Sequence, residues 1–205
     1  MISSESWLYI FIGLILLNFI FSSVLEYVND KNWNDEIPYS LKDYYDRKKY
    51  STAKEYKKAR GRVSLISSSL SITFTLIILI TGFYGYVSDY IYTKFSSPFL
   101  HSAIFFLFFY CLNMLVSIPI NYYSTFIIEE KFGFNKTTKK TFLADILKGT
   151  LMSILIGGLL LAVAILILNY FSEGFWFWLW LSLSIFTVFI SICLLYTSDA
   201  ADDIP

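Results

Sequence analysis

Long apolar segments with almost no charged residues alternate along this chain with strongly charged ones. A helix of about 20 apolar residues crosses a hydrocarbon layer roughly 30 Å thick, so each long segment predicts one membrane-spanning helix. We expect spans at about residues 6–28, 63–88, 95–128, 149–172 and 174–192. The pattern therefore predicts an all-α polytopic membrane protein with about five transmembrane helices.

Two of these segments predict more than a simple crossing. Segment 95–128 is longer than one crossing requires, so we expect a tilted helix that continues past the membrane near Pro119. The first segment is expected to stay as an anchor. Glu5 precedes it and no Lys or Arg does, which differs from the basic leader of a cleaved signal peptide.

Composition supports a membrane protein and excludes other classes. Apolar residues make up 56% of the chain and charged residues 16%, whereas a soluble domain carries roughly a quarter charged residues. Sixteen Lys and Arg balance sixteen Asp and Glu, so nothing indicates a nucleic-acid partner. Cys111 and Cys193 stand alone in apolar segments, so no disulfide framework or cysteine metal site is expected.

The placement of the basic residues predicts an orientation. Segment 29–62 contains ten Lys and Arg, segment 129–148 contains five, and Lys94 is the remaining one. Basic loops stay in the cytoplasm, so we expect the N-terminus outside and loops 29–62 and 129–148 inside. The richness in Ile, Lys, Asn and Phe indicates an AT-rich genome and hence a bacterial plasma membrane.

The first of these loops is expected to contain two short helices. Ser40 with Asp43, and Thr52 with Glu55, have the spacing of capping boxes at helix starts. The second helix should continue through Gly61 into the span that follows. Its basic, tyrosine-rich stretch has two interpretations. It fits a docking surface for anionic lipid or for a substrate tail, and it fits an ordinary solvated loop on the cytoplasmic side.

Segment 126–148 predicts a helix, a tight turn and a second helix. The acidic pair Glu129 and Glu130 ends a long span, and Gly133 can take the left-handed conformation that terminates a helix. Asn135 or Thr137 can cap the next helix. That helix is amphipathic, with one apolar face formed by Phe142, Leu143, Ile146 and Leu147.

The order of residues in this segment is similar to a known signature. The residues concerned are Glu129, Glu130, Lys131, Gly133, Phe134, Asn135, Thr138, Phe142, Asp145 and Lys148, preceded by Ile37, Pro38, Tyr50, Ser51, Tyr56 and Pro119. Together they resemble the N-terminal membrane region of the CAAX prenyl protease 1 family, over roughly residues 1–192. The resemblance implies an incomplete part of a fold in which seven helices enclose an intramembrane chamber. It also implies a zinc metalloendopeptidase that acts on prenylated or other membrane-associated peptides.

The chain departs from that family in the residues that would do the chemistry. A peptidase of this kind needs His-Glu-x-x-His on one helix face to hold zinc and activate water. His101 is the one histidine, and it stands at the start of an apolar span. We therefore assign no catalytic residue, no metal ligand and no cofactor to this chain, and we expect zinc only in the complete protein. The alternative is a non-enzymatic membrane scaffold or transporter component.

Polar residues inside the predicted spans have two interpretations. They are Asn18, Asn113, Asn121, Ser64, Ser67, Ser68, Ser69 and Ser71. They fit the lining of a water-filled chamber, and they fit hydrogen bonding and close packing between helices equally well.

The last residues of the chain do not resemble the end of a membrane helix. Segment 193–205 carries three aspartates and no basic residue. Residues 193–203 are similar to the in-frame translation of a transposase adapter used in preparing sequencing libraries. We expect the native sequence to end near Ile192, with 193–205 as a non-native tail.

The predicted orientation can be tested by thiol labelling in intact cells. Single cysteines replacing Ser51 and Thr138 should be shielded from a membrane-impermeant reagent, because both lie in basic loops. A cysteine replacing Ser3 should be labelled. Labelling of the two loop positions from outside would show that the orientation is reversed.

Overall fold

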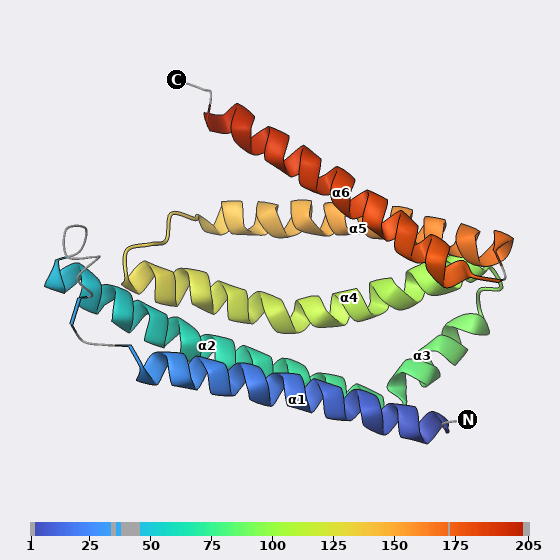
Figure 1. The fold of residues 1–205 in the computed structure, drawn as a ribbon, viewed down its shortest axis with the longest axis horizontal. Helices are drawn as coiled ribbons and strands as arrows, with labels where there is room; N and C mark the ends of the chain where they lie inside the picture. Colours follow the sequence, from blue (N-terminus) through green and yellow to red (C-terminus); the bar gives the residue numbers. More distant parts are fainter. Residues whose placement is uncertain (1–2, 34–35, 38–45, 172, 203–205) are drawn as a thin grey trace. The chain divides into compact units, whose positions relative to one another are not determined.

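The computed structural model describes residues 3–33, 36–37, 46–171 and 173–202, and all regular structure in that part is helical. The elements are α1 (Ser4–Lys31), α2 (Arg47–Ile80), α3 (Phe83–Tyr92), α4 (Pro98–Tyr123), the π-helix η2 (Ser124–Glu129), α5 (Lys139–Tyr170) and α6 (Phe175–Asp202) (Figure 1). The predicted all-α fold class is confirmed.

Five helical segments are long and apolar enough to cross a membrane: Glu5–Lys31, Arg47–Ile80, Pro98–Glu129, Lys139–Tyr170 and Phe175–Cys193. Their large apolar side chains point outward, for example Leu17 at 65% and Leu155 at 67% exposed. Only five hydrophobic residues of the described part are buried, on α2, α3, η2 and α5. Such surfaces need lipid around them, so this is an integral membrane protein.

The chain divides into two compact units. The first comprises residues 1–94 and 105–145, and the second comprises 95–104 and 146–205. Within the first unit α1 and α2 lie side by side and run in opposite directions (Figure 1). In the second unit Phe171, just after α5, stacks on Trp178 of α6 with ring centroids 4.7 Å apart.

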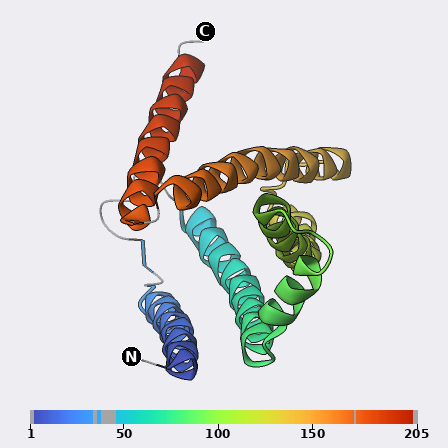
Figure 2. The same ribbon diagram turned by 90° about the vertical axis from the view of Figure 1, so that its right-hand side faces the viewer.

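The predicted span 63–88 is divided between two helices in the structure. α2 ends at Ile80, and Gly82 takes a left-handed φ of 67° before α3 begins. A left-handed residue ends the hydrogen-bond ladder of a helix, and glycine does so without strain. α3 then leaves α2 at an angle, as Figure 2 shows. Its Tyr84 ring packs 4.5 Å from the Phe109 ring of α4, which supplies a reason for the change of direction.

α4 continues through Pro119, as expected, and passes directly into the π-helix η2. A proline inside a helix removes one backbone hydrogen bond, and single π-turns commonly occur where a helix is locally widened. The long third segment is thus one helical rod from Pro98 to Glu129.

Several predicted helix starts differ in the structure. α2 begins at Arg47, where the Asp46 carboxylate accepts a hydrogen bond from the Lys49 amide at 2.7 Å, so Thr52 is not the cap. Thr52 lies inside the helix, and its hydroxyl donates to the Lys48 carbonyl. The predicted continuation through Gly61 is confirmed. The predicted cap with Ser40 and Asp43 lies outside the described residues.

The last two helices extend beyond their predicted limits. α5 begins at Lys139, so the expected amphipathic helix and the span that begins near Gly149 form one helix. α6 runs to Asp202 without a break at Ile192. Side chains beyond Cys193 lie outside the described part, and the origin of segment 193–205 stays a prediction.

Candidate functional site

The segment between η2 and α5 forms a tight helix-ending turn. We call residues 129–135 the EEKFGFN turn. Gly133 has a φ of 75°. The Phe134 amide donates to the Glu129 carbonyl at 2.9 Å, and the Gly133 amide donates to the Glu130 carbonyl at 3.1 Å. This is a Schellman motif, which satisfies the last carbonyls of a helix and requires the left-handed residue that glycine supplies.

Asn135 connects the two sides of the turn through its side-chain amide. Its Nδ2 donates to the Glu130 carboxylate at 2.8 Å. Its Oδ1 accepts a hydrogen bond from the Thr137 backbone amide at 2.7 Å. Only a side chain with both a donor and an acceptor makes this pair of bonds, so asparagine fits this position and aspartate does not.

The turn is fixed against the N-terminal part of α2 by aromatic contacts. The Tyr56 ring of α2 lies 5.5 Å from the Phe132 ring and 4.7 Å from the Phe134 ring, both in edge-on geometry. The Tyr56 hydroxyl also accepts a hydrogen bond from Arg60 at 3.1 Å. These contacts join Tyr56 to the signature residues, although 76 positions (132 minus 56) separate it from Phe132 in the chain.

The remaining signature residues do not take part in the turn's hydrogen bonds. The cap of α5 is Thr138, whose hydroxyl accepts a hydrogen bond from the Thr141 amide at 3.1 Å. Neither of the two expected caps, Asn135 and Thr137, takes this position. Lys131 lies 5.5 Å from the centre of the Phe132 ring. Asp145 and Lys148 are exposed on α5.

The described residues do not fit a zinc site. No group of three or more His, Cys, Asp or Glu side chains in the described part of the chain could hold a metal ion. Zinc sites in proteins use three or four such ligands, mostly His and Cys. Glu130 is instead hydrogen bonded to Asn135, and His101 lies in the first turn of α4.

A second candidate site is a polar groove between α1 and α2, with a volume of about 350 Å³. Its lining is Ile15, Asn18, Phe19, Ser22, Ser23 and Glu26 on α1, with Leu65, Ser67, Ser68, Ser71, Ile72 and Thr75 on α2. The structure therefore brings four of the predicted intramembrane polar residues together. Asn113 and Asn121 lie on α4, and Ser64 and Ser69 do not line the groove.

Sequence reasoning missed half of the polar groove residues. Ser22, Ser23, Glu26 and Thr75 join the four predicted ones because α1 and α2 pack side by side. The spacing 18, 22 and 26 on α1 matches 67, 71 and 75 on α2, each four residues apart and so on one helix face. This repeated spacing of polar residues in the sequence could have predicted that these two helix faces form one groove.

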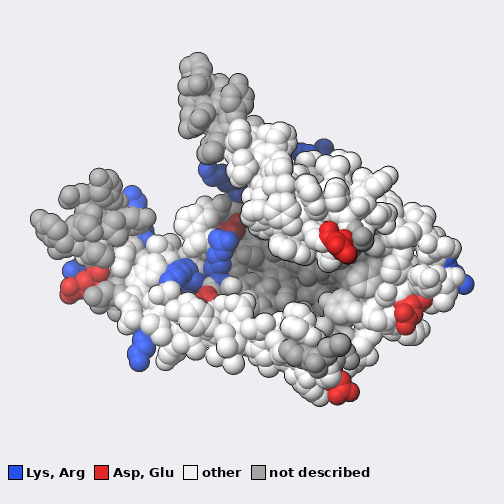
Figure 3. Space-filling view, turned by 45° about the vertical axis from the view of Figure 1, so that its right-hand side comes forward, with Lys and Arg blue, Asp and Glu red and all other residues white. Residues whose placement is uncertain are grey.

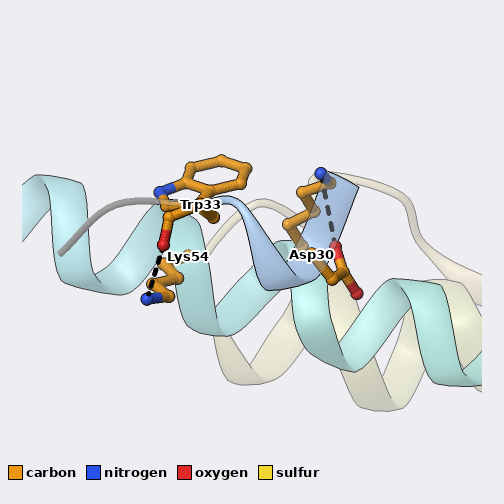
Figure 4. Close-up of polar contacts among 4 residues, drawn as sticks. Asp30, Trp33 and Lys54 are labelled. Atoms are coloured by element: carbon orange, nitrogen blue, oxygen red, sulfur yellow. Dashed lines mark hydrogen bonds and ion pairs between the residues drawn. The ribbon is translucent and has the colours of Figure 1, made fainter. Parts of the chain in front are cut away.

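A cluster of polar contacts joins the end of α1 to the N-terminal part of α2, as Figure 4 shows. Asp30 forms an ion pair with Lys57 at 3.3 Å. Lys57 Nζ also lies 4.7 Å from the centre of the Trp33 ring, and Lys54 Nζ donates to the Trp33 carbonyl at 3.2 Å. These contacts hold the chain that follows α1 against the first turns of α2.

The chain is similar to a family of membrane proteins over most of its length. The family model for the CAAX prenyl protease N-terminal region, described as five membrane helices, matches residues 26–196. The chain is 34% identical over 158 residues to a probable CAAX prenyl protease 1 of Schizosaccharomyces pombe, covering 67% of this chain and 32% of that protein. It is 30% identical over 172 residues to a CAAX prenyl protease 1 homolog of Dictyostelium discoideum, covering 80% and 40% respectively.

The fold is also that of a solved structure. The crystal structure of S. mikatae Ste24p superposes with a TM-score of 0.77 and 25% identity, over 90% of this chain and 44% of the other. The chain therefore spans about a third to two-fifths of the length of the curated relatives it matches.

The contact between Tyr56 and the EEKFGFN turn can be tested by two substitutions. Y56A removes two aromatic pairs, each of which stabilises the fold by about 0.5–1.5 kcal/mol. Y56F keeps the ring contacts with Phe132 and Phe134 and loses only the exposed hydrogen bond between the hydroxyl and Arg60. We expect Y56A to lower the thermal unfolding midpoint in detergent by about 3–8 °C and Y56F by about 1 °C or less. Equal effects of the two changes would show that the rings do not stabilise the turn.

Proposed function

Because this chain belongs to the CAAX prenyl protease N-terminal family, we propose that it forms the N-terminal membrane region of a zinc metalloendopeptidase that cleaves prenylated or other membrane-associated peptides. The match over residues 26–196 carries the proposal. The agreement of the fold with Ste24p over 90% of the chain supports it.

In this proposal the chain provides the membrane enclosure and the reacting groups lie outside it. The described residues offer no set of three metal ligands, so the residues that hold zinc would belong to another part of the complete protein. Zinc would supply Lewis-acid activation of water there. The polar groove of α1 and α2 would form part of the wall of a water-filled chamber.

The same proposal includes an orientation and a location. Ten Lys and Arg lie in loop 29–62, five lie in loop 129–148, and the remaining one is Lys94. This distribution supports an N-terminus outside the cell and both loops in the cytoplasm. The composition supports a bacterial plasma membrane, although the relatives named above come from eukaryotes.

A chimera tests the function. Residues 1–192 would replace the matching N-terminal region of the S. pombe relative, and cleavage of a prenylated peptide would be measured in membranes that lack the natural enzyme. We expect cleavage by the chimera, because the two regions share one fold. The present chain alone should cleave nothing and hold no stoichiometric zinc at micromolar affinity.

The remaining part of the relative, expressed without any N-terminal region, is the control for the chimera. A chimera that inserts into membranes yet cleaves no better than this control would contradict the proposal. That outcome would favour the non-enzymatic scaffold.

The chamber wall is tested separately by water accessibility. Charged methanethiosulfonate reagents modify a thiol only where water reaches it, since the thiolate forms in water and not in lipid. A cysteine that replaces Ser71, which lines the groove, should react in membranes opened to the reagent on both sides. A cysteine that replaces the neighbouring Leu70 should react at least about tenfold more slowly, because Leu70 is 50% exposed and lies outside the groove. The background chain carries C111S and C193S. Similar rates at the two positions would show that the groove holds no more water than the lipid-facing surface.

A further inference from the structure

The first four turns of α2 carry a strong excess of positive charge. Residues 47–62 contain eight Lys and Arg and one acidic residue, Glu55. The first turn has no acidic residue, although a helix N-terminus is itself electropositive. Figure 3 shows Lys and Arg side chains, in blue, on one face of the molecule.

Three of these basic side chains already have partners within the protein. Lys57 pairs with Asp30, Lys54 bonds to the Trp33 carbonyl, and Arg60 bonds to the Tyr56 hydroxyl. Lys58 and Arg62 are exposed and have no hydrogen bond or ion pair within the described residues. These two side chains are therefore available to an external anion.

The two available side chains share one side of α2 with Lys54. Positions 54, 58 and 62 are four residues apart, so each lies within about 40° of the next around the helix axis. The uncharged run begins at Val63, which puts Arg62 at the edge of the hydrocarbon layer. Lys54 is then about 12 Å further out along the helix, at 1.5 Å per residue. This distance covers the headgroup layer, which is roughly 5–8 Å thick, and the first few ångströms of solvent.

We propose that Lys54, Lys58 and Arg62 bind the headgroup of an anionic phospholipid at the membrane boundary of α2. The guanidinium of Arg62 suits two hydrogen bonds to a phosphate, and the lysine ammonium groups add charge above it. Trp33 lies beside Lys54 and Lys57, and tryptophan prefers the headgroup level of a bilayer. This surface lies outside the groove and outside the EEKFGFN turn, so the proposal does not depend on the protease function.

Trp33 provides the measurement. The chain has five tryptophans, and replacing Trp7, Trp176, Trp178 and Trp180 by Phe leaves Trp33 as the reporter. The full chain would be reconstituted in phosphatidylcholine vesicles that contain a minor fraction of either phosphatidylglycerol or phosphatidylcholine carrying an anthroyloxy acceptor on one acyl chain. Energy transfer from tryptophan to this acceptor reaches across the headgroup layer, so the ratio of quenching by the two lipids reports local enrichment of the anionic one.

We expect phosphatidylglycerol to be enriched about tenfold around Trp33 at low salt, and the enrichment to fall as salt is raised. K58Q/R62Q should reduce the enrichment to about twofold or less. The conservative pair K58R/R62K should retain it, which separates loss of charge from loss of fold. Unchanged helicity by circular dichroism is required of each variant.

The matched control is K48Q/K49Q on the same helix. Both lysines are exposed and the change in charge is identical, but they lie about 14 Å or more further from the boundary than Lys58, beyond a Debye length at physiological salt. The control should leave the enrichment within about twofold of the parent. Equal quenching by the two lipids, or equal losses in both double variants, would overturn the proposal. So would protection of Trp33 by an acidic peptide without lipid enrichment, which would assign the surface to a peptide instead.

Discussion

The fold depends on the requirement that a backbone inside a hydrocarbon layer must form its hydrogen bonds within its own segment. Each unsatisfied amide or carbonyl there costs several kcal/mol, so the described chain crosses the layer only as long helices. The departures from regular helix satisfy their backbone groups locally. The Gly133 turn does so through its Schellman bonds, and η2 through π-helical bonds that continue α4 without a gap.

Lipid also decides which side chains can face outward. Apolar side chains such as Leu17 and Leu155 are exposed because the surrounding phase is as apolar as they are. Polar side chains in the same helices are costly unless they share a polar volume or bond to one another. The groove between α1 and α2 collects eight of them in one place. A common polar space for these side chains is consistent with the wall of an intramembrane chamber.

α2 connects the features on which the functional proposals depend. Its membrane part carries Ser67, Ser71 and Thr75 on the groove face. Its N-terminal part carries Tyr56, which contacts the EEKFGFN turn, and the basic residues at the membrane boundary. Because Arg47–Ile80 is one uninterrupted helix, the groove, the turn contact and the basic surface have a fixed register relative to one another along it. The aromatic contact with the turn extends that register to the end of η2.

Local sequence patterns predicted the elements that depend on local interactions. The five long apolar segments, the left-handed Gly133 and the continuity of α2 through Gly61 all follow from helix length, glycine geometry and helix propensity, and the structure has each of them. The predicted helix starts were less accurate, because several residues with hydroxyl, amide or carboxylate side chains near one helix terminus can each act as the cap. Asp46 and Thr138 occupy the cap positions that Thr52 and Asn135 could also have filled.

By itself, the sequence determined that this chain is a membrane protein with about five helical spans, because hydrophobic length and charge act through lipid and need no tertiary contact. It also determined the order of residues that indicates the family. Only the tertiary structure decided that Tyr56 packs on Phe134, that α3 turns away from α2 at Gly82, and which polar residues share a groove. These depend on which helix faces meet. Side chains distant in sequence come together only when two helices pack, and no local pattern specifies their relative rotation.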